Sequence, residues 1–333
     1  MTRIARAVQG LRPLLNVRLG ALGLVLLANW ALFPGFFDLS VQDGRLFGSL
    51  IDVLNRGAPV AILAIGMTAV IATRGVDLSV GAIMAVSGAV AASLVVAGYP
   101  TAVAVGAALA AGVLCGLWNG FLIAVLEMQP IVATLVLMVA GRGIAQLITA
   151  GSIVTFDDPW LVYLGTGAFA GLPMAAIIMG VLMVAAILMV RRTAFGLFIE
   201  AVGVNASAAR VSGLRSRAVI LLVYGFSGFC AAVAGVLAAA DIRGADANNA
   251  GLWLELDAIL AVVIGGTSLL GGRFSIAMSV VGAMIIQAMN TGILVSGFAP
   301  EFNLVVKAGV IIALLVLQSP KAAGLLRRLR GRL

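Results

Sequence analysis

Long apolar runs, separated by short polar or glycine-rich stretches, fill this chain from one end to the other. Most runs approach twenty residues, enough to cross a hydrocarbon core of about 30 Å at roughly 1.5 Å per residue. No stretch between them is long enough for a separate soluble domain. The pattern predicts an all-α polytopic membrane protein with about ten spans in one transmembrane domain, residues 1–333. The predicted spans are 18–35, 57–73, 78–98, 101–126, 130–150, 172–190, 218–240, 255–270, 274–296 and 303–319.

The basic residues cluster in three blocks that set the expected topology. Four of the 21 Lys and Arg residues lie in 1–18, five in 191–217 and five in 321–332. The positive-inside bias assigns all three blocks to the cytoplasm. Six predicted spans separate the first two blocks and four separate the last two, so each set of crossings returns the chain to the same side. We therefore expect cytoplasmic N- and C-termini and a cytoplasmic segment over about 191–217.

Composition narrows the chemistry that this chain can perform. Hydrophobic residues make up 62% of the chain, charged residues 10%, and histidine is absent, which excludes imidazole-based triads and proton relays. Cys115 and Cys230 lie inside apolar runs and are expected to be core side chains. The net charge of +8 reflects the blocks above, not a nucleic-acid surface. The N-terminus has the basic head of a signal peptide but no convincing cleavage site, so an uncleaved first helix is expected.

The stretch RGVDLSVG, residues 74–81, places two opposite charges between consecutive apolar runs. An offset of 191 residues superposes 69–81 on 260–272 with three shared positions, and paired glycine-interrupted segments of this kind are typical of broken helices lining a pathway. Two geometries are open: a cytoplasmic turn with solvated charges, or a hairpin that turns inside the membrane. In either, Asp77 and Ser79 are expected at the start of the next helix, where a carboxylate accepts free backbone N–H groups.

Several polar residues interrupt the apolar runs. Arg142 lies about twelve residues into the run 130–150, where a charged side chain costs on the order of 2.5–3.5 kcal/mol and needs a partner or water. A structural contact and a pathway role are both open for it. For the amides, hydrogen bonding between helices is the favoured interpretation. The candidate pathway or structural polar residues are Asp77, Ser79, Asn119, Arg142, Thr267, Ser268 and Asn290.

The cytoplasmic segment predicts a short, smooth helix near 206–212. Asn205 is a good N-cap, Arg210 favours a helix C-terminus, and Gly213 is a natural residue just past the end. The small side chains between them suit insertion into a groove on another protein, although an idle surface helix is the alternative. The chain contains no GxxxxGK[ST] sequence, so if it is a pump its motor is another subunit.

These residues carry a resemblance to a known family. GVDLSVG, EAVGVNASAARVSG and GGTSLLGGRF resemble the signatures of permease subunits of bacterial ABC sugar importers of the ribose, galactose and arabinose type. Three further stretches, among them LMVAGRGIAQLITAG, are similar to the branch of that family that imports galactofuranose. The family commonly has Gly-Gly before its first signature, whereas this chain has Arg74-Gly75.

The resemblance implies a type II-like ABC importer permease in a bacterial inner membrane. It implies a tandem ATPase that holds ATP and magnesium while this chain binds no cofactor, a periplasmic sugar-binding protein, and a second homologous permease. A heterodimer is favoured and a homodimer is possible. Carried over by position, the ATPase contact would consist of Glu200, Asn205, Ala208, Ala209, Arg210 and Gly213.

Two other classes of function remain as alternatives. A self-sufficient secondary transporter or channel would use intramembrane ionisable residues for ion coupling, and the predicted spans contain no row of carboxylates. A membrane-embedded enzyme would need a nucleophile and base or a metal constellation, and the sequence offers neither pattern. The resemblance implies instead a non-enzymatic transport subunit for a monosaccharide, galactofuranose or a related sugar.

Overall fold

The computed structural model describes residues 19–31, 33–42 and 45–295, and the isolated positions 297, 302, 304–306, 308 and 309. The predicted basic blocks at 1–18 and 321–332, and most of the predicted span 303–319, lie outside the described residues. The remaining spans can be compared with the helices directly.

Helices dominate the described part of the chain, and six of them are long and apolar enough to cross a membrane. Each predicted span from 18–35 to 274–296 contains a helix, so the polytopic all-α prediction is confirmed. The helices are Leu19–Ala31, α2 (Ser49–Ala72), α3 (Val80–Val96), α4 (Thr101–Ala124), α5 (Pro130–Ile148), α6 (Pro159–Thr166), α7 (Met174–Arg192), α8 (Phe195–Val204), α9 (Ala206–Val211), α10 (Ser216–Asp241), α11 (Leu254–Ile264) and α12 (Ile276–Val295).

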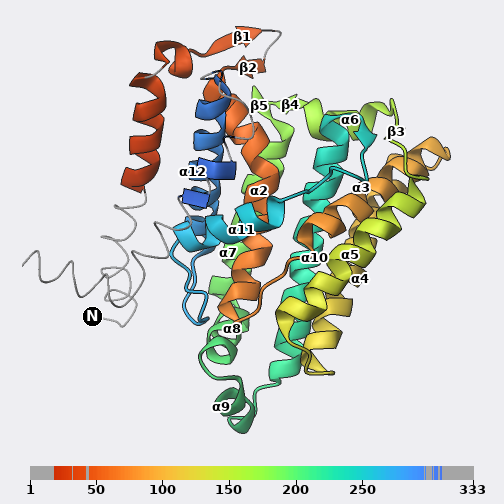
Figure 1. Ribbon diagram of the computed structural model, residues 1–333, viewed down its shortest axis with the longest axis vertical. Helices are drawn as coiled ribbons and strands as arrows, with labels where there is room; N and C mark the ends of the chain where they lie inside the picture. The colour runs from red at the N-terminus through yellow and green to blue at the C-terminus, as the bar shows by residue number, and fades with distance from the viewer. Residues whose placement is uncertain are drawn as a thin grey trace, which may run out of the picture.

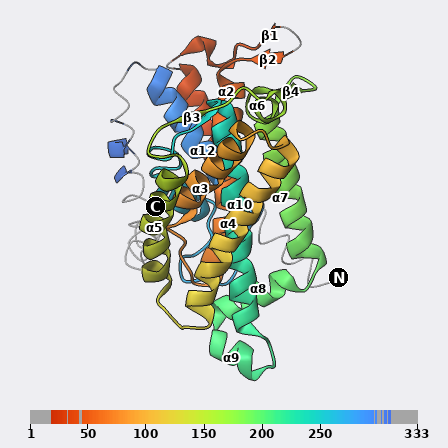
Figure 2. The same cartoon turned by 90° about the vertical axis from the view of Figure 1, so that its right-hand side faces the viewer.

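Small extended elements gather at one end of the bundle. Three antiparallel pairs and a 3-10 turn lie there, together with α6, while α8 and α9 lie at the opposite end (Figures 1 and 2). We call these the hairpin end and the α9 end. The turn is η1 (Pro34–Phe37), and the paired strands are β1 (Ser40–Gln42) with β2 (Arg45–Phe47), β3 (Val154–Thr155) with β6 (Gly244–Ala245), and β4 (Ala168–Phe169) with β5 (Leu172–Pro173).

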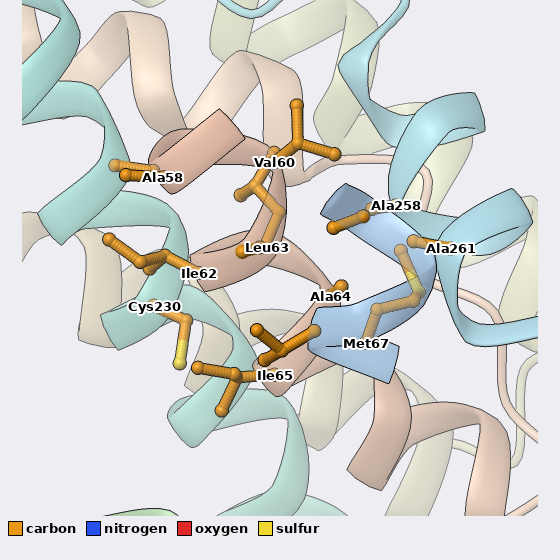
Figure 3. Close-up of a cluster of buried hydrophobic side chains, with 14 of the residues drawn as sticks. Ala58, Val60, Ile62, Leu63, Ala64, Ile65, Met67, Cys230, Ala258 and Ala261 are labelled. Carbon is orange, nitrogen blue, oxygen red and sulfur yellow. The ribbon is translucent and has the colours of Figure 1, made fainter. Parts of the chain in front are cut away.

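The core is built around α2, which is buried on every side over most of its length. Figure 3 shows its side chains between α10, which contributes Cys230, and α11, which contributes Ala258 and Ala261. A helix that is apolar all round is expected in the interior of a membrane bundle. The prediction that Cys230 is a core residue is confirmed, since it is fully buried.

Glycine brings α4 and α10 into close contact. A Cβ added to Gly116 would overlap the carbonyl oxygen of Tyr224, and one added to Gly228 would overlap that of Gly112. Small residues let backbones approach where hydrophobic driving force between helices is weak. The helix α10 packs against α4 through these glycines, and it also packs against α2 and α3.

The helices α3 and α11 are shorter than the runs 78–98 and 255–270 predicted. The run 255–270 contains only α11, eleven residues or about 17 Å at 1.5 Å per residue, and cannot cross a 30 Å core as a helix. It ends at Ile264 because Gly265 and Gly266 follow, and Gly266 has φ +80°. In Figure 1, α11 lies crosswise at mid-height, and the chain climbs back from the lower end of α2 before α3 begins. Both short helices adjoin an irregular segment.

Candidate translocation and coupling site

Two irregular segments interrupt the helical bundle. The first break is residues 73–79, between α2 and α3, and the second break is residues 265–275, between α11 and α12. They are the segments that the 191-residue offset pairs, and both lie between helices as predicted. The echo fails in detail, because Gly81 lies within α3 whereas its counterpart Gly272 lies in the second break with φ +96°.

A buried polar cluster, the Asp77 cluster, fixes the first break. Asp77 is fully buried, and its Oδ1 accepts hydrogen bonds from the backbone N–H and the hydroxyl of Ser79, at 3.1 and 2.6 Å. Its Oδ2 accepts one from the Ser227 hydroxyl of α10, at 2.8 Å. Asn119 of α4 donates from Nδ2 to the Ser79 hydroxyl at 2.8 Å. The carboxylate thus joins the start of α3 to α10 directly, and α4 joins them through the Ser79 hydroxyl. The carboxylate stays buried because its oxygens are satisfied.

The helix-start prediction for Asp77 is confirmed only in part. Asp77 accepts the N–H of Ser79, the residue that precedes α3, but its other strong contact is with Ser227, which is distant in the chain. Sequence reasoning missed Ser227 and also Tyr224, whose hydroxyl donates to the Val76 carbonyl at 3.4 Å. Their signal was visible as polar side chains in the run 218–240, but nothing in the sequence indicates which segment they contact.

Arg74 and Asp77 lie in the same turn but differ in how far their side chains are buried in the protein. Arg74 lies two residues beyond the end of α2, at the α9 end, and is exposed, whereas Asp77 is fully buried three residues later. The turn is therefore exposed at Arg74 and enters the interior of the protein at Asp77. Arg74 has φ +66°, a left-handed conformation that favours glycine.

The second break is built mainly from glycine and exposed side chains. Gly266, Gly271 and Gly272 all have positive φ, at +80°, +77° and +96°. Thr267 is buried with an Oγ1 that has no hydrogen-bond partner among the described residues, whereas Ser268 is exposed and accepts the N–H of Leu270 at 3.1 Å. Neither side chain reaches the Asp77 cluster through a hydrogen bond within the described part of the chain.

The two breaks touch each other and α8 at the α9 end. The N–H of Gly272 donates to the carbonyl of Ala72, the last residue of α2, at 2.9 Å. A Cβ on Gly203 of α8 would overlap the same carbonyl oxygen. The backbone at the end of α8 therefore lies directly against the backbone of the end of α2 and of the second break.

The short helix of the basic segment forms as predicted. Asn205 Oδ1 accepts the N–H of Ala208 at 3.0 Å, Arg210 lies in the last turn of α9, and Gly213 follows with φ +85°. Of the residues carried over to the ATPase contact, four are exposed, but Ala209 is buried in this chain's own core and Glu200 of α8 is half-buried. The exposed members are Asn205, Ala208, Arg210 and Gly213.

Arg142 belongs to a different region, near the hairpin end. Its Nη1 donates to the carbonyls of Ala247 and Ala250, at 3.0 and 2.6 Å, in the segment that joins β6 to α11. The guanidinium of Arg142 thus supplies hydrogen bonds to two carbonyl groups of a non-helical segment. A structural contact of this kind was one of the two roles that the sequence left open for Arg142. In the same segment the Asn249 amide, together with the N–H groups of Asn249 and Asn248, holds the pKa of Asp246 below its usual range.

The other candidate amides are not brought to the Asp77 cluster by any described hydrogen bond. Asn290 lies on α12, and its Oδ1 is buried without a hydrogen-bond partner in the described residues. Gln146 of α5 donates to the Asn248 side chain at 2.8 Å, and both residues are exposed. A further buried pair that the sequence did not indicate, Thr68 of α2 and Ser279 of α12, joins two core helices at 2.8 Å.

A helical bundle with interrupted apolar spans is the architecture of a polytopic membrane protein. The chain belongs to the family described as branched-chain amino acid transport system / permease component, which matches residues 49–315.

The relatives of this chain are named as permeases for sugars. The chain is 59% identical over 315 residues to the galactofuranose transporter permease of Escherichia coli, covering 95% of this chain and 92% of the relative. It is 42% identical to the fructose import permease of Bifidobacterium longum, over 84% of this chain and 80% of that one. It is 38% identical to the ribose import permease of Escherichia coli, over 87% and 89%. No solved structure matches the chain significantly.

Family membership makes this chain a membrane-spanning permease component and implies an ATPase and a solute-binding protein as partners. The relatives are transport subunits, which fits a role in translocation and not in catalysis. The substrate, the arrangement of partners and the orientation in the membrane are matters for proposal.

Proposed function

We propose that this chain is one permease of an ATP-driven importer for galactofuranose or a closely related monosaccharide. The observation that carries the proposal is the 59% identity to a galactofuranose transporter permease across nearly the whole of both chains. The fructose and ribose permeases are more distant, at 42% and 38% identity. Selectivity can reside in the binding protein, so the permease need not hold the sugar tightly.

The α9 end faces the cytoplasm and docks the ATPase. Arg191, Arg192, Arg210, Arg215 and Arg217 gather there, and the positive-inside bias supports a cytoplasmic location for them and for both termini. The exposed residues of α9 are small apart from Arg210 and Val211, which suits a groove on another protein. ATP and magnesium are held by that partner.

The face of α5 pairs with a second, homologous permease around the sugar pathway. Nine of the nineteen residues of α5 are exposed and all of these but Gln146 are apolar, yet Gln146 and Asn248 form an exposed amide pair near its end. Exposed amides in a spanning region are costly against lipid, so this face is better accounted for by a partner and a wet pathway. The proposed partner is a related chain in a heterodimer, and a second copy of this chain is the alternative.

The test is reconstitution of the full transporter in proteoliposomes. The two permeases, the ATPase and the binding protein should import radiolabelled galactofuranose when ATP is present on the ATPase side, and import ribose and fructose at least about tenfold more slowly. Uptake by this chain alone, driven by an ion gradient without ATPase, would overturn the proposal in favour of a secondary transporter.

Docking at α9 has its own test. Arg210→Glu reverses an exposed charge on the proposed contact and should abolish binding-protein-stimulated ATP hydrolysis while the permease still inserts and assembles with its partner permease. Arg243→Glu, a change of an exposed arginine next to β6 at the hairpin end, is the control and should leave stimulation intact. Normal stimulation in Arg210→Glu would place the docking surface elsewhere.

A further inference from the structure

One side chain, Arg74, joins the three segments that meet at the α9 end. Its Nε donates to the carbonyl of Leu270 in the second break at 2.8 Å, and its Nη2 donates to the carbonyl of Val204, the last residue of α8, at 2.6 Å. Arg74 itself belongs to the first break. A guanidinium has several donors in a rigid planar fork, so one side chain can hold two separate carbonyls in a fixed relation.

The backbone segments around Arg74 are tightly packed against one another. A Cβ on Gly271 would lie 2.5 Å from the Arg74 Cγ and 3.0 Å from the carbonyl oxygen of Gly203. Gly203 in turn contacts the carbonyl of Ala72, which accepts the N–H of Gly272. Because segments packed this closely cannot slide independently, a displacement of the end of α8 must displace both breaks.

The first break passes such a displacement inward. Gly75 lies under the Tyr224 hydroxyl, where an added Cβ would be 2.5 Å away, and Asp77 is held to Ser79 and Ser227. Only two residues separate Arg74 from Asp77, and α3 begins at Val80. Movement of Arg74 therefore acts on the start of α3, while its bond to Leu270 acts on the segment that leads to α12.

We propose that Arg74 is a positioning residue that transmits the movement of α8 and α9 to both breaks, so that nucleotide-driven motion of the docked ATPase opens and closes the sugar pathway. The inference rests on the proposed function, since it requires α9 to be the ATPase contact. The backbone supports a specific role: φ +66° favours glycine, yet the position carries a long cation that makes two hydrogen bonds.

The decisive variant is Arg74→Gly, because glycine removes the guanidinium and also relieves the left-handed backbone. Arg243→Gly is the matched control: Arg243 is another exposed arginine with positive φ, +52°, but it lies at the hairpin end, next to β6. The measurement is the number of sugar molecules imported per ATP hydrolysed, in proteoliposomes containing the complete transporter. In Arg74→Gly this ratio should fall about tenfold with ATP hydrolysis retained, and in Arg243→Gly it should not change. Arg74→Lys, which keeps the charge but not the fork, should give an intermediate ratio.

A second measurement follows the second break directly. Ser268 is exposed, so Ser268→Cys can be labelled by a water-soluble thiol reagent with and without ATP, against the same chain lacking the added cysteine. ATP should change the labelling rate when Arg74 is present, and this change should disappear with Arg74→Gly.

The outcomes separate the inference from the proposed function. If the unmodified transporter imports no sugar with ATP, the proposed function fails. If it does import sugar and Arg74→Gly keeps both the transport ratio and the ATP-dependent labelling, transmission through Arg74 is overturned. Loss of assembly in both Arg74→Gly and Arg74→Lys would show a purely structural role and would also overturn it.

Discussion

The two breaks occupy corresponding places between consecutive helices, yet they are held in opposite ways. The first break is held by side chains: Asp77 is fully buried and accepts three hydrogen bonds, from Ser79 and Ser227. The second break is held by backbone conformation: three glycines have positive φ, and Ser268, Leu269 and Leu270 are exposed.

The difference predicts different sensitivities. A segment fixed by buried hydrogen bonds is destabilised when an acceptor is lost, because the remaining buried donors have neither a protein partner nor water. A segment fixed by left-handed glycines tolerates changes of polarity and is damaged by a Cβ. The breaks meet where Gly203, Ala72 and Gly272 touch. This joint should tolerate neither the loss of a hydrogen-bond acceptor nor an added Cβ.

The largest effect is expected at the joint. Gly203→Ala places a methyl group against the carbonyl oxygen of Ala72 and close to the N–H of Gly272, so the end of α8 must move away from both breaks. We expect a loss of about 3 kcal/mol of stability, at the upper end of overpacking costs. Melting of the purified permease in detergent measures it. Gly180→Ala in α7 meets nothing within 4 Å and should be neutral or slightly stabilising, and an equal loss there would refute the tight joint.

The next effect separates shape from hydrogen bonding in the first break. Asp77→Ala leaves the donors of Ser79 and Ser227 unpaired in the interior and should cost about 2 kcal/mol. Asp77→Asn keeps an oxygen for Ser79, and the Ser227 hydroxyl can turn to accept, so it should cost roughly half as much. The same detergent melting assay compares them. Equal losses would mean that the carboxylate charge, and not the acceptor geometry, holds the break.

Much of this arrangement could be predicted from local sequence. The positions of the helices could be predicted because a continuous apolar run long enough to span a membrane is visible in the local sequence. The bounds of α9 could be predicted from Asn205 and Gly213 because helix caps act within one turn. The exposed and buried ends of the first break could not be predicted. Arg74 and Asp77 have the same spacing in a surface turn as in a hairpin that enters the bundle.

Long-range partners could not be predicted for a related reason. Asp77 meets Ser227 at a separation of 150 residues, and Arg74 meets Leu270 at 196. One sequence indicates that buried polar groups need partners, but it does not indicate which helix supplies them. The shortness of α11 was also hidden, since Leu269 and Leu270 extend the apolar run past the glycines that end the helix.

A smaller effect is expected in the second break. Gly266 is exposed with φ +80°, so Gly266→Ala should cost about 1 kcal/mol through backbone strain alone. Gly266→Asn should cost less, because asparagine tolerates left-handed conformations better than alanine does. Detergent melting of the two variants decides the matter. If asparagine were the worse of the two, the constraint at Gly266 would be steric and would not arise from the backbone conformation.

The smallest effect comes from an aspartate that differs from Asp77 chiefly in burial. Asp246 also accepts three hydrogen bonds, from Asn248 and Asn249, but it is only half-buried, near the hairpin end. Because these bonds lower its pKa in the folded state, its stabilising contribution is complete above the ordinary aspartate pKa of about 3.9 and is lost as pH falls through the lower folded value. Asp246→Asn should therefore lower the melting temperature only slightly at pH 7, and the difference from the unmodified chain should shrink below about pH 4. If Asp246→Asn were as damaging as Asp77→Ala, the number of hydrogen bonds and not burial would set the cost, and the explanation given for the first break would fail.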